Sequence, residues 1–96
     1  MKYSDLPRNK RTFTCSHIVE DDKEPLLVTT DRGGDIWITC GCAPTDPELV
    51  KLVGIGHMLE KFSGFEKQNI CPFGSEFSRI GPGLPWQLKA ASITFD

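Results

Sequence analysis

The sequence lacks the features that would place this protein in a membrane or export it. No apolar run among its 96 residues approaches the ~18 residues of a membrane-spanning helix. Residues 1–11 contain no apolar segment of the kind found in secretory signal peptides. We therefore expect a cytoplasmic protein without a membrane partner, whose four cysteines stay reduced.

A strong positive charge and the common catalytic motifs are missing as well. The net charge is −2 at pH 7, whereas proteins that bind nucleic acids normally carry a basic patch. The chain has no P-loop, dinucleotide-binding fingerprint or nucleophile elbow, and Gly54-x-Gly56 lacks the third glycine of a phosphate-binding motif. We expect no nucleic-acid partner and no cofactor, and no motif identifies an enzyme class.

What is present is the composition of one small globular domain. Hydrophobic residues make up 39% of the chain and charged residues 25%, which are ordinary values. Residues 1–11 are mainly basic in charge, and we expect them to form a flexible N-terminal tail. Residues 12–96 are expected to form a single α+β domain.

Alternating apolar and polar residues predict an antiparallel sheet. In the first strand, Phe13, Cys15, His17 and Val19 share one face. The predicted strands are residues 12–19, 26–30, 35–40, 76–80 and 86–89. A tight turn at residues 31–34 joins the second strand to the third, and the first three strands are expected to form a meander in chain order.

A helical period predicts one long helix over residues 46–62. Pro47 stands in its first turn, where a proline costs no hydrogen bond. The apolar arc is wide enough for the helix to be covered by other elements, and Leu52 and Leu59 are expected in the core. The predicted fold is an antiparallel sheet of about five strands with one main helix packed on one face.

Two pairs of residues have the ligand types of a structural zinc site, Cys15-x-His17 and Cys40-x-Cys42. In a meander the first and third strands flank the second, so they lie about 9.6 Å apart, twice the inter-strand spacing. That separation is too long for ligands of one ion, and the chain has no Cys-x-x-Cys spacing. We therefore expect no metal, with Cys15 and Cys40 as small core residues and His17 as a hydrogen-bonded strand residue. If zinc is bound, these four residues are its ligands.

Two catalytic arrangements are less well supported. Cys42 lies shortly before the predicted helix, whose dipole would favour a thiolate, with His17 or His57 as the base. Asp46, His57 and Glu60 offer a carboxylate–histidine group on the helix itself. Neither arrangement has the motif of an activated nucleophile, so no catalytic residue is assigned.

Function is expected to lie in binding. The favoured prediction is a protein-binding or regulatory module with a protein partner of unknown identity. The alternative is a small-molecule-binding protein or a small enzyme that uses His17, His57 and Arg79, which would have to converge in one concavity. Trp37 alternates onto the more exposed strand face and is expected, with Trp86, to supply aromatic binding residues.

Several short motifs, taken together, resemble those of a group of small, uncharacterised bacterial proteins. The motifs are Cys15-Ser16-His17-Ile18, Gly34-Asp35-x-Trp37, Cys40-Gly41, Val53-Gly54-x-Gly56-His57-x-Leu59-Glu60, Arg79 and Trp86. The resemblance covers residues 15–86, and Cys42 departs from it because such proteins have a solitary Cys-Gly at this point. It implies no established activity, although some members are similar to immunity-type accessory proteins.

Overall fold

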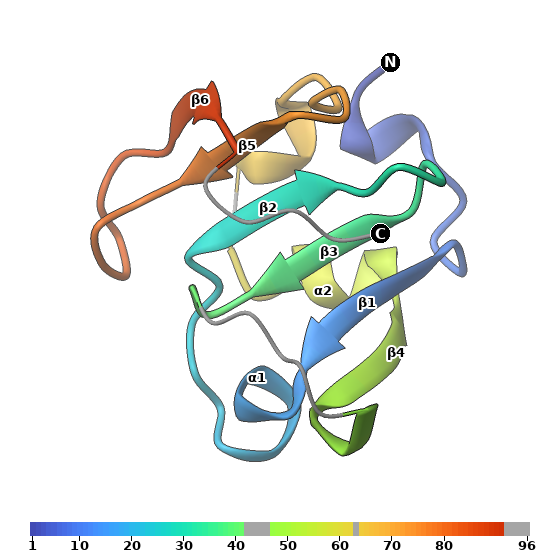
Figure 1. The fold of residues 1–96 in the computed structure, drawn as a ribbon, viewed down its shortest axis with the longest axis vertical. Coiled ribbons are helices and arrows are strands. Elements are labelled where there is room, and N and C mark those ends of the chain that lie inside the picture. The colour runs from blue at the N-terminus through green and yellow to red at the C-terminus, as the bar shows by residue number, and fades with distance from the viewer. Residues whose placement is uncertain (42–46, 63, 92–96) are drawn as a thin grey trace.

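Short elements follow one another in the computed structural model, which describes residues 1–41, 47–62 and 64–91 (Figure 1). The strands are β1 (Arg11–Cys15), β2 (Leu27–Thr30), β3 (Ile36–Thr39), β4 (Val50–Gly54), β5 (Ser75–Ser78) and β6 (Gln87–Ala90). The helices are α1 (Ser16–Glu20) and α2 (Ile55–Leu59), and the 3₁₀ turns are η1 (Tyr3–Asp5), η2 (Pro47–Leu49) and η3 (Phe65–Lys67). The predicted α+β class is confirmed.

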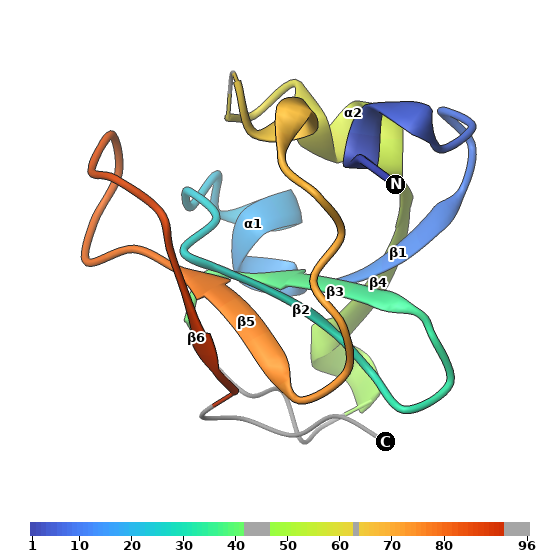
Figure 2. The ribbon, with the colours of Figure 1, turned by 90° about the horizontal axis from the view of Figure 1, so that it is seen from above.

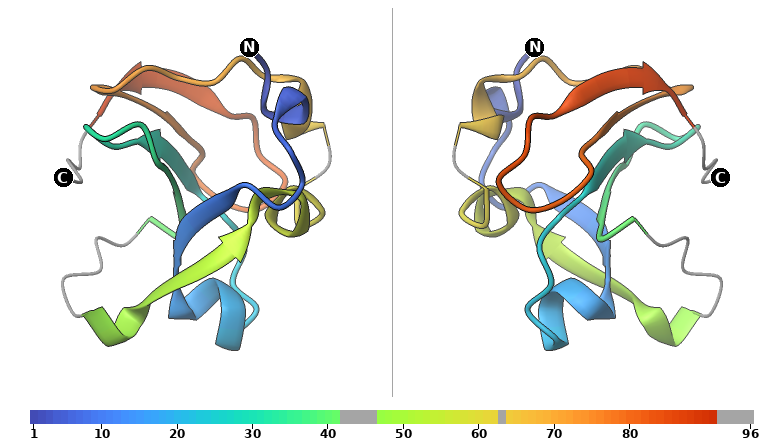
Figure 3. Two further views of the ribbon diagram at one scale, coloured as in Figure 1. Left: turned by 90° about the vertical axis from the view of Figure 1, so that its right-hand side faces the viewer. Right: turned by 90° about the vertical axis from the view of Figure 1, so that its left-hand side faces the viewer.

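These six strands form one mixed sheet in the order β4-β1-β3-β2-β5-β6. β1 runs parallel to β3, with Thr14 opposite Ile38, and the other pairings are antiparallel. The predicted meander in chain order is therefore wrong, because β1 lies beside β3 and not beside β2. The connection from β1 to β2 contains α1 and is long enough for the crossover that parallel pairing of β1 with β3 requires. Figure 3 shows that the sheet is strongly curved.

The β2–β3 hairpin was predicted correctly, including its turn. The Asp31 amide donates to the Asp35 carbonyl at 2.8 Å, and the Gly34 amide donates to the Asp31 carbonyl at 3.0 Å. Gly34 has a φ of 89°, in the left-handed region that glycine adopts without steric cost. β5 and β6 also lie within two residues of their predicted positions.

The predicted long helix over residues 46–62 is wrong. In its described part, η2, β4 and α2 follow one another. β4 pairs with β1 from Val50 opposite Cys15 to Gly54 opposite Arg11, and the β-branched Val50 and Val53 suit a pleated strand. A short apolar run satisfies the helical and the strand period equally well, so here the partner strand decides the conformation.

The first predicted strand ends earlier than expected. β1 stops at Cys15, and residues 16–20 form α1 in place of the strand that was predicted to reach residue 19. The amides of Asp21 and Lys23 both donate to the His17 carbonyl at 3.1 Å, which ends the helix. His17 therefore extends from a helix that starts directly after the strand.

Two glycines let the N-terminal segment approach α2 closely. A Cβ on Gly54 would lie 3.0 Å from the Arg8 carbonyl oxygen, and one on Gly56 would lie 2.8 Å from the Arg8 side chain. The Ile55 and Gly56 amides donate to the carbonyls of Lys10 and Arg8 at 2.7 and 3.0 Å. Residues 8–10 are thus hydrogen-bonded to the start of α2.

The core lies between the sheet and the helices, and it includes the N-terminus. Figure 2 shows α1, α2 and the N-terminal turn on the same side of the sheet. Tyr3 is only 1% exposed, and its ring lies 5.1 Å from that of Phe65. This packing corrects the expectation of a flexible tail over residues 1–11. The buried core cluster comprises Tyr3, Cys15, Ile18, Val28, Ile36, Ile38, Ile55, Met58, Phe62, Phe65, Cys71 and Phe77.

Leu52 is not a core residue, so its truncation should have little effect. Its side chain is 59% exposed on β4, whereas Leu27 on β2 is 4% exposed. We expect Leu52→Ala to cost at most about 1 kcal/mol, the span of strand propensity. We expect the matched Leu27→Ala to cost about 2–5 kcal/mol through lost burial and a cavity. Urea unfolding of both variants measures the two values, and equal losses would contradict this assignment of β4.

Candidate functional site

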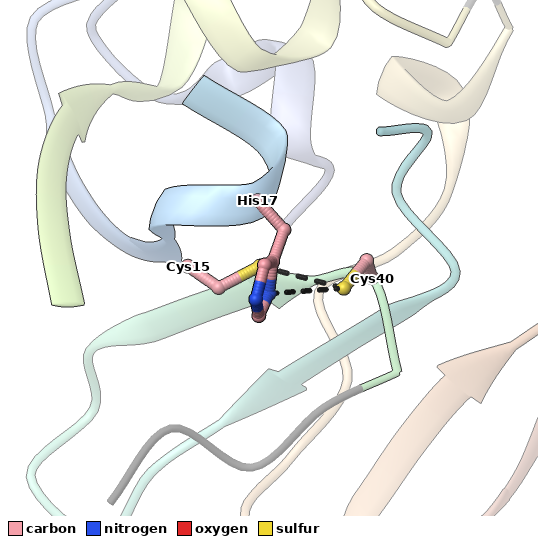
Figure 4. A group of neighbouring side chains, drawn as sticks. All are labelled: Cys15, His17 and Cys40. Atoms are coloured by element: carbon pink, nitrogen blue, oxygen red, sulfur yellow. Dashed lines mark hydrogen bonds between the residues drawn. The ribbon is translucent and has the colours of Figure 1, made fainter. Parts of the chain in front are cut away.

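A cysteine, a histidine and a second cysteine meet at one end of the β1–β3 pair (Figure 4). Cys15 is the last residue of β1, His17 lies in the first turn of α1, and Cys40 directly follows β3. Because β1 and β3 are parallel neighbours, their carboxyl ends lie at the same edge of the sheet. The start of α1 directly after Cys15 turns the His17 side chain toward both sulfurs. We call these three residues the Cys–His cluster.

The cluster is compact and largely shielded from solvent. The Cys15 and Cys40 Sγ atoms are 3.7 Å apart, and the Cys40 Sγ lies 3.6 Å from the His17 Nδ1. All three potential ligand atoms lie within 4.8 Å of one another. Cys15 is fully buried, whereas His17 and Cys40 are half-buried. One side of the group is therefore accessible from the surface.

These distances match the edges of a tetrahedral metal site. Bond lengths of about 2.3 Å to sulfur and about 2.0–2.1 Å to nitrogen put two sulfur ligands about 3.8 Å apart, and a sulfur and a nitrogen about 3.6 Å apart. The contacts of the Cys40 Sγ with Cys15 and His17 agree with both values. The third edge, from Cys15 to His17, is at most 4.8 Å. The cluster has the ligand types and the spacing of a Cys₂His zinc site.

The topology removes the main argument against a metal at these residues. In the predicted meander, the first and third strands lie on opposite sides of the second strand, too far apart to share an ion. In the structure β1 and β3 are hydrogen-bonded neighbours, so Cys15 and Cys40 are brought together. The fourth residue of the predicted ligand set, Cys42, lies outside the described residues.

Cys71, which the sequence analysis did not single out, is a core residue apart from the cluster. It is 2% exposed, and its Sγ lies 3.7 Å from the Tyr3 hydroxyl and 3.8 Å from the Val28 carbonyl oxygen. These contacts are those of a small side chain buried in the core.

The other predicted binding residues serve mainly internal contacts. Trp37 is half-buried, not exposed; its ring stacks on Phe13 at 4.8 Å, and its indole N–H donates to the Asp31 carboxylate at 2.8 Å. Arg79 and Trp86 are brought together, with the guanidinium 4.6 Å from the indole centroid. Through these contacts, Trp37 and Arg79 stabilise the fold.

His57 does not join the other predicted residues. It is exposed on α2, whereas His17 belongs to the Cys–His cluster. Arg79 lines two cavities of about 440 and 450 Å³, and neither histidine contributes to them. The alternative site formed by His17, His57 and Arg79 therefore has no common concavity among these cavities.

Comparisons with known proteins reveal no relative of this chain, so its function is proposed from the geometry of the site. Protein-family models, curated proteins and solved structures all give no match to this chain. The resemblance to small bacterial proteins and the predicted protein-binding role therefore stay predictions. Within the described residues, no helix has both the length and the apolar character needed to cross a membrane. The protein is thus a small α+β domain in which two cysteines and one histidine already lie close together.

Proposed function

We propose that this protein is a zinc-binding domain whose ion is held by Cys15, His17 and Cys40. The observation that carries the proposal is the agreement of the contacts at Cys40, 3.7 Å to sulfur and 3.6 Å to nitrogen, with the edges of a zinc tetrahedron. Thiolate and imidazole together favour zinc among the common divalent metals, since carboxylate and water ligands would suit magnesium or calcium. A water molecule or a further ligand completes the fourth position.

The place of the three ligands in the fold supports a structural role; three protein ligands with a water would also be the ligand set of a catalytic zinc ion. The three ligands come from the end of β1, the start of α1 and the residue after β3. An ion there would link the two central parallel strands to α1, at a point where the core is close to the surface. Free energy of metal binding to a preformed site contributes directly to folding, and a domain of 96 residues buries only a modest core. A reducing compartment such as the cytoplasm would keep both thiols available as ligands.

Zinc content and affinity test the proposal. We expect one equivalent of zinc per chain by elemental analysis, and His17→Ala should lower the affinity by at least about 100-fold in competition with a chromophoric chelator. The only other histidine, the exposed His57, supplies the matched control, because His57→Ala should leave the affinity unchanged. Cobalt substitution should give a thiolate charge-transfer band and the intense visible bands of a tetrahedral ion.

The competing description is that the two thiols and the imidazole form hydrogen bonds in the folded protein and hold no metal. It predicts no stoichiometric zinc, no cobalt–thiolate band, and equal behaviour of His17→Ala and His57→Ala. Any of these results with correctly folded protein would contradict the zinc site. A Cys42→Ser variant that loses zinc entirely would show that the three described side chains are insufficient as ligands.

A further inference from the structure

The two cysteines of the cluster are placed to form a bond with each other as well as with a metal. Their Sγ atoms are 3.7 Å apart, and a disulfide needs about 2.05 Å, so the sulfurs must approach by about 1.7 Å. Both residues lie at the ends of adjacent strands, where side-chain rotation does not disturb the ladder from Phe13–Trp37 to Thr14–Ile38.

We propose that the Cys15–Cys40 pair is a redox switch that releases zinc when a hydroperoxide oxidises it to a disulfide. The inference rests on the proposed zinc site and adds its regulation. Among the three ligands only His17 would remain after oxidation, and a single imidazole does not retain zinc against cellular competitors. Reduction of the disulfide by a thiol would restore the site.

The difference in burial between Cys15 and Cys40 determines which cysteine reacts first. Cys40 is half-buried and Cys15 is fully buried, so a small peroxide reaches the Cys40 sulfur first. The Cys40 thiolate attacks the peroxide, the O–O bond breaks, and a sulfenic acid and one hydroxide form. The Cys15 thiolate then attacks the Cys40 sulfur, forming the S–S bond and expelling a second hydroxide.

The step balances without a further reactant. The two thiolates together lose two electrons, and these reduce one hydrogen peroxide to two hydroxide ions, which take up two protons from solvent to give two waters. The zinc leaves as Zn²⁺ with no change in oxidation state. One peroxide therefore yields one disulfide and one released zinc ion.

The test exposes zinc-loaded protein to one equivalent of hydrogen peroxide. A chromophoric chelator follows zinc release, and peptide mass mapping after alkylation locates the disulfide. We expect one zinc per chain to be released together with a Cys15–Cys40 disulfide, and dithiothreitol should allow zinc to rebind. Cys71 should stay reduced, because it is 2% exposed and lies in the core apart from Cys15 and Cys40. The same experiment in Cys42→Ser protein should give the same result.

A redox-inert ligand at one position provides the decisive comparison. Cys40→His exchanges a thiolate ligand for an imidazole, which changes the zinc affinity but keeps three ligands, and it cannot form the Cys15–Cys40 disulfide. We expect this variant to bind zinc and to retain it in peroxide, with at least a tenfold slower release. If Cys40→His does not fold, the peptide map of the wild-type protein alone still decides the bond.

The outcomes separate this inference from the zinc site itself. Zinc that binds with one equivalent but stays bound in peroxide would overturn the switch and leave the zinc domain intact. A disulfide that joins Cys42 or Cys71 to a cluster cysteine would overturn the assigned pair. Protein that binds no zinc before oxidation would overturn the proposed function and, with it, the switch.

Discussion

Replacing Tyr3 with alanine is expected to lower the free energy of unfolding by about 3–5 kcal/mol, the usual cost of deleting a buried aromatic ring. Tyr3 is 1% exposed, and its ring contacts Phe65 within the aromatic part of the core. Phe65 in turn contacts Phe62, Phe77 and Trp86, with ring centroids 4.8, 5.3 and 4.8 Å away. Loss of the Tyr3 ring would open a cavity beside this whole group.

Urea unfolding measures the change, and two variants supply the controls. Tyr3→Phe keeps the ring and removes the hydroxyl, which accepts from the Cys71 amide at 3.4 Å, so we expect a loss of only about 1–3 kcal/mol. Phe73→Ala removes an aromatic ring that is 45% exposed and packs against the Arg32 guanidinium, and it should cost about 1 kcal/mol or less. A Tyr3→Ala protein as stable as Phe73→Ala would show that residues 1–11 are a tail after all.

Titration of the Tyr3 phenol is a second test of its burial, because Tyr3 is the only tyrosine in the chain. Burial raises the pKa of Tyr3 above its ordinary value of 10.0, and the charge of Cys71 and the hydrogen bond to its side chain act in the same direction, whereas the hydrogen bond from the Cys71 backbone amide acts against them. Above about pH 10 the unfolded chain therefore loses the phenolic proton while the folded chain keeps it, and stability falls as pH rises. Ultraviolet absorbance should show a delayed tyrosinate transition in folded protein, and Tyr3→Phe should lose this part of the alkaline destabilisation.

Zinc is expected to stabilise the domain by about 2.7 kcal/mol when its free concentration is 100 times the dissociation constant. For a domain of this length, each kcal/mol shifts the melting temperature by about 4–8 °C, so the midpoint should rise by roughly 10–20 °C. The reason is that the folded chain presents Cys15, His17 and Cys40 together, whereas the unfolded chain does not. A strong chelator should reverse the shift.

The two histidines again separate a specific effect from a general one. Thermal unfolding of His57→Ala should show the full zinc-dependent shift, and His17→Ala should show little or none. An equal shift in both variants, or a wild-type midpoint that neither zinc nor chelator moves, would contradict the proposed site. The second result is the one expected from the strand order that the sequence analysis assumed.

Some features of this protein followed from local sequence alone. Gly34 and the polar residues before it favour a tight turn whatever surrounds them, so the β2–β3 hairpin was predicted with its turn. The same holds for the α+β class and for the positions of β5 and β6, where alternation is confined to short segments between turn residues. The Cys-x-His pair was also recognisable, because ligand type and spacing are properties of the chain.

Other features depended on which segments meet. Residues 50–54 satisfy a helical and a strand period, and they form β4 because β1 offers a partner strand. Tyr3 follows no periodic pattern, and it is buried because Phe65 and Cys71 lie where the N-terminus returns to the fold. Neither outcome is encoded within the segment concerned.

The candidate site combines both kinds of information. Sequence by itself determined its residue types, two cysteines and a histidine in short-range pairs, since these are written in the chain. Only the tertiary structure decided that the pairs meet, because strand order is set by long-range pairing and by the core that each arrangement buries. The parallel pairing of β1 with β3 replaces a separation of about 9.6 Å, twice the spacing of neighbouring strands, by a sulfur–sulfur contact of 3.7 Å.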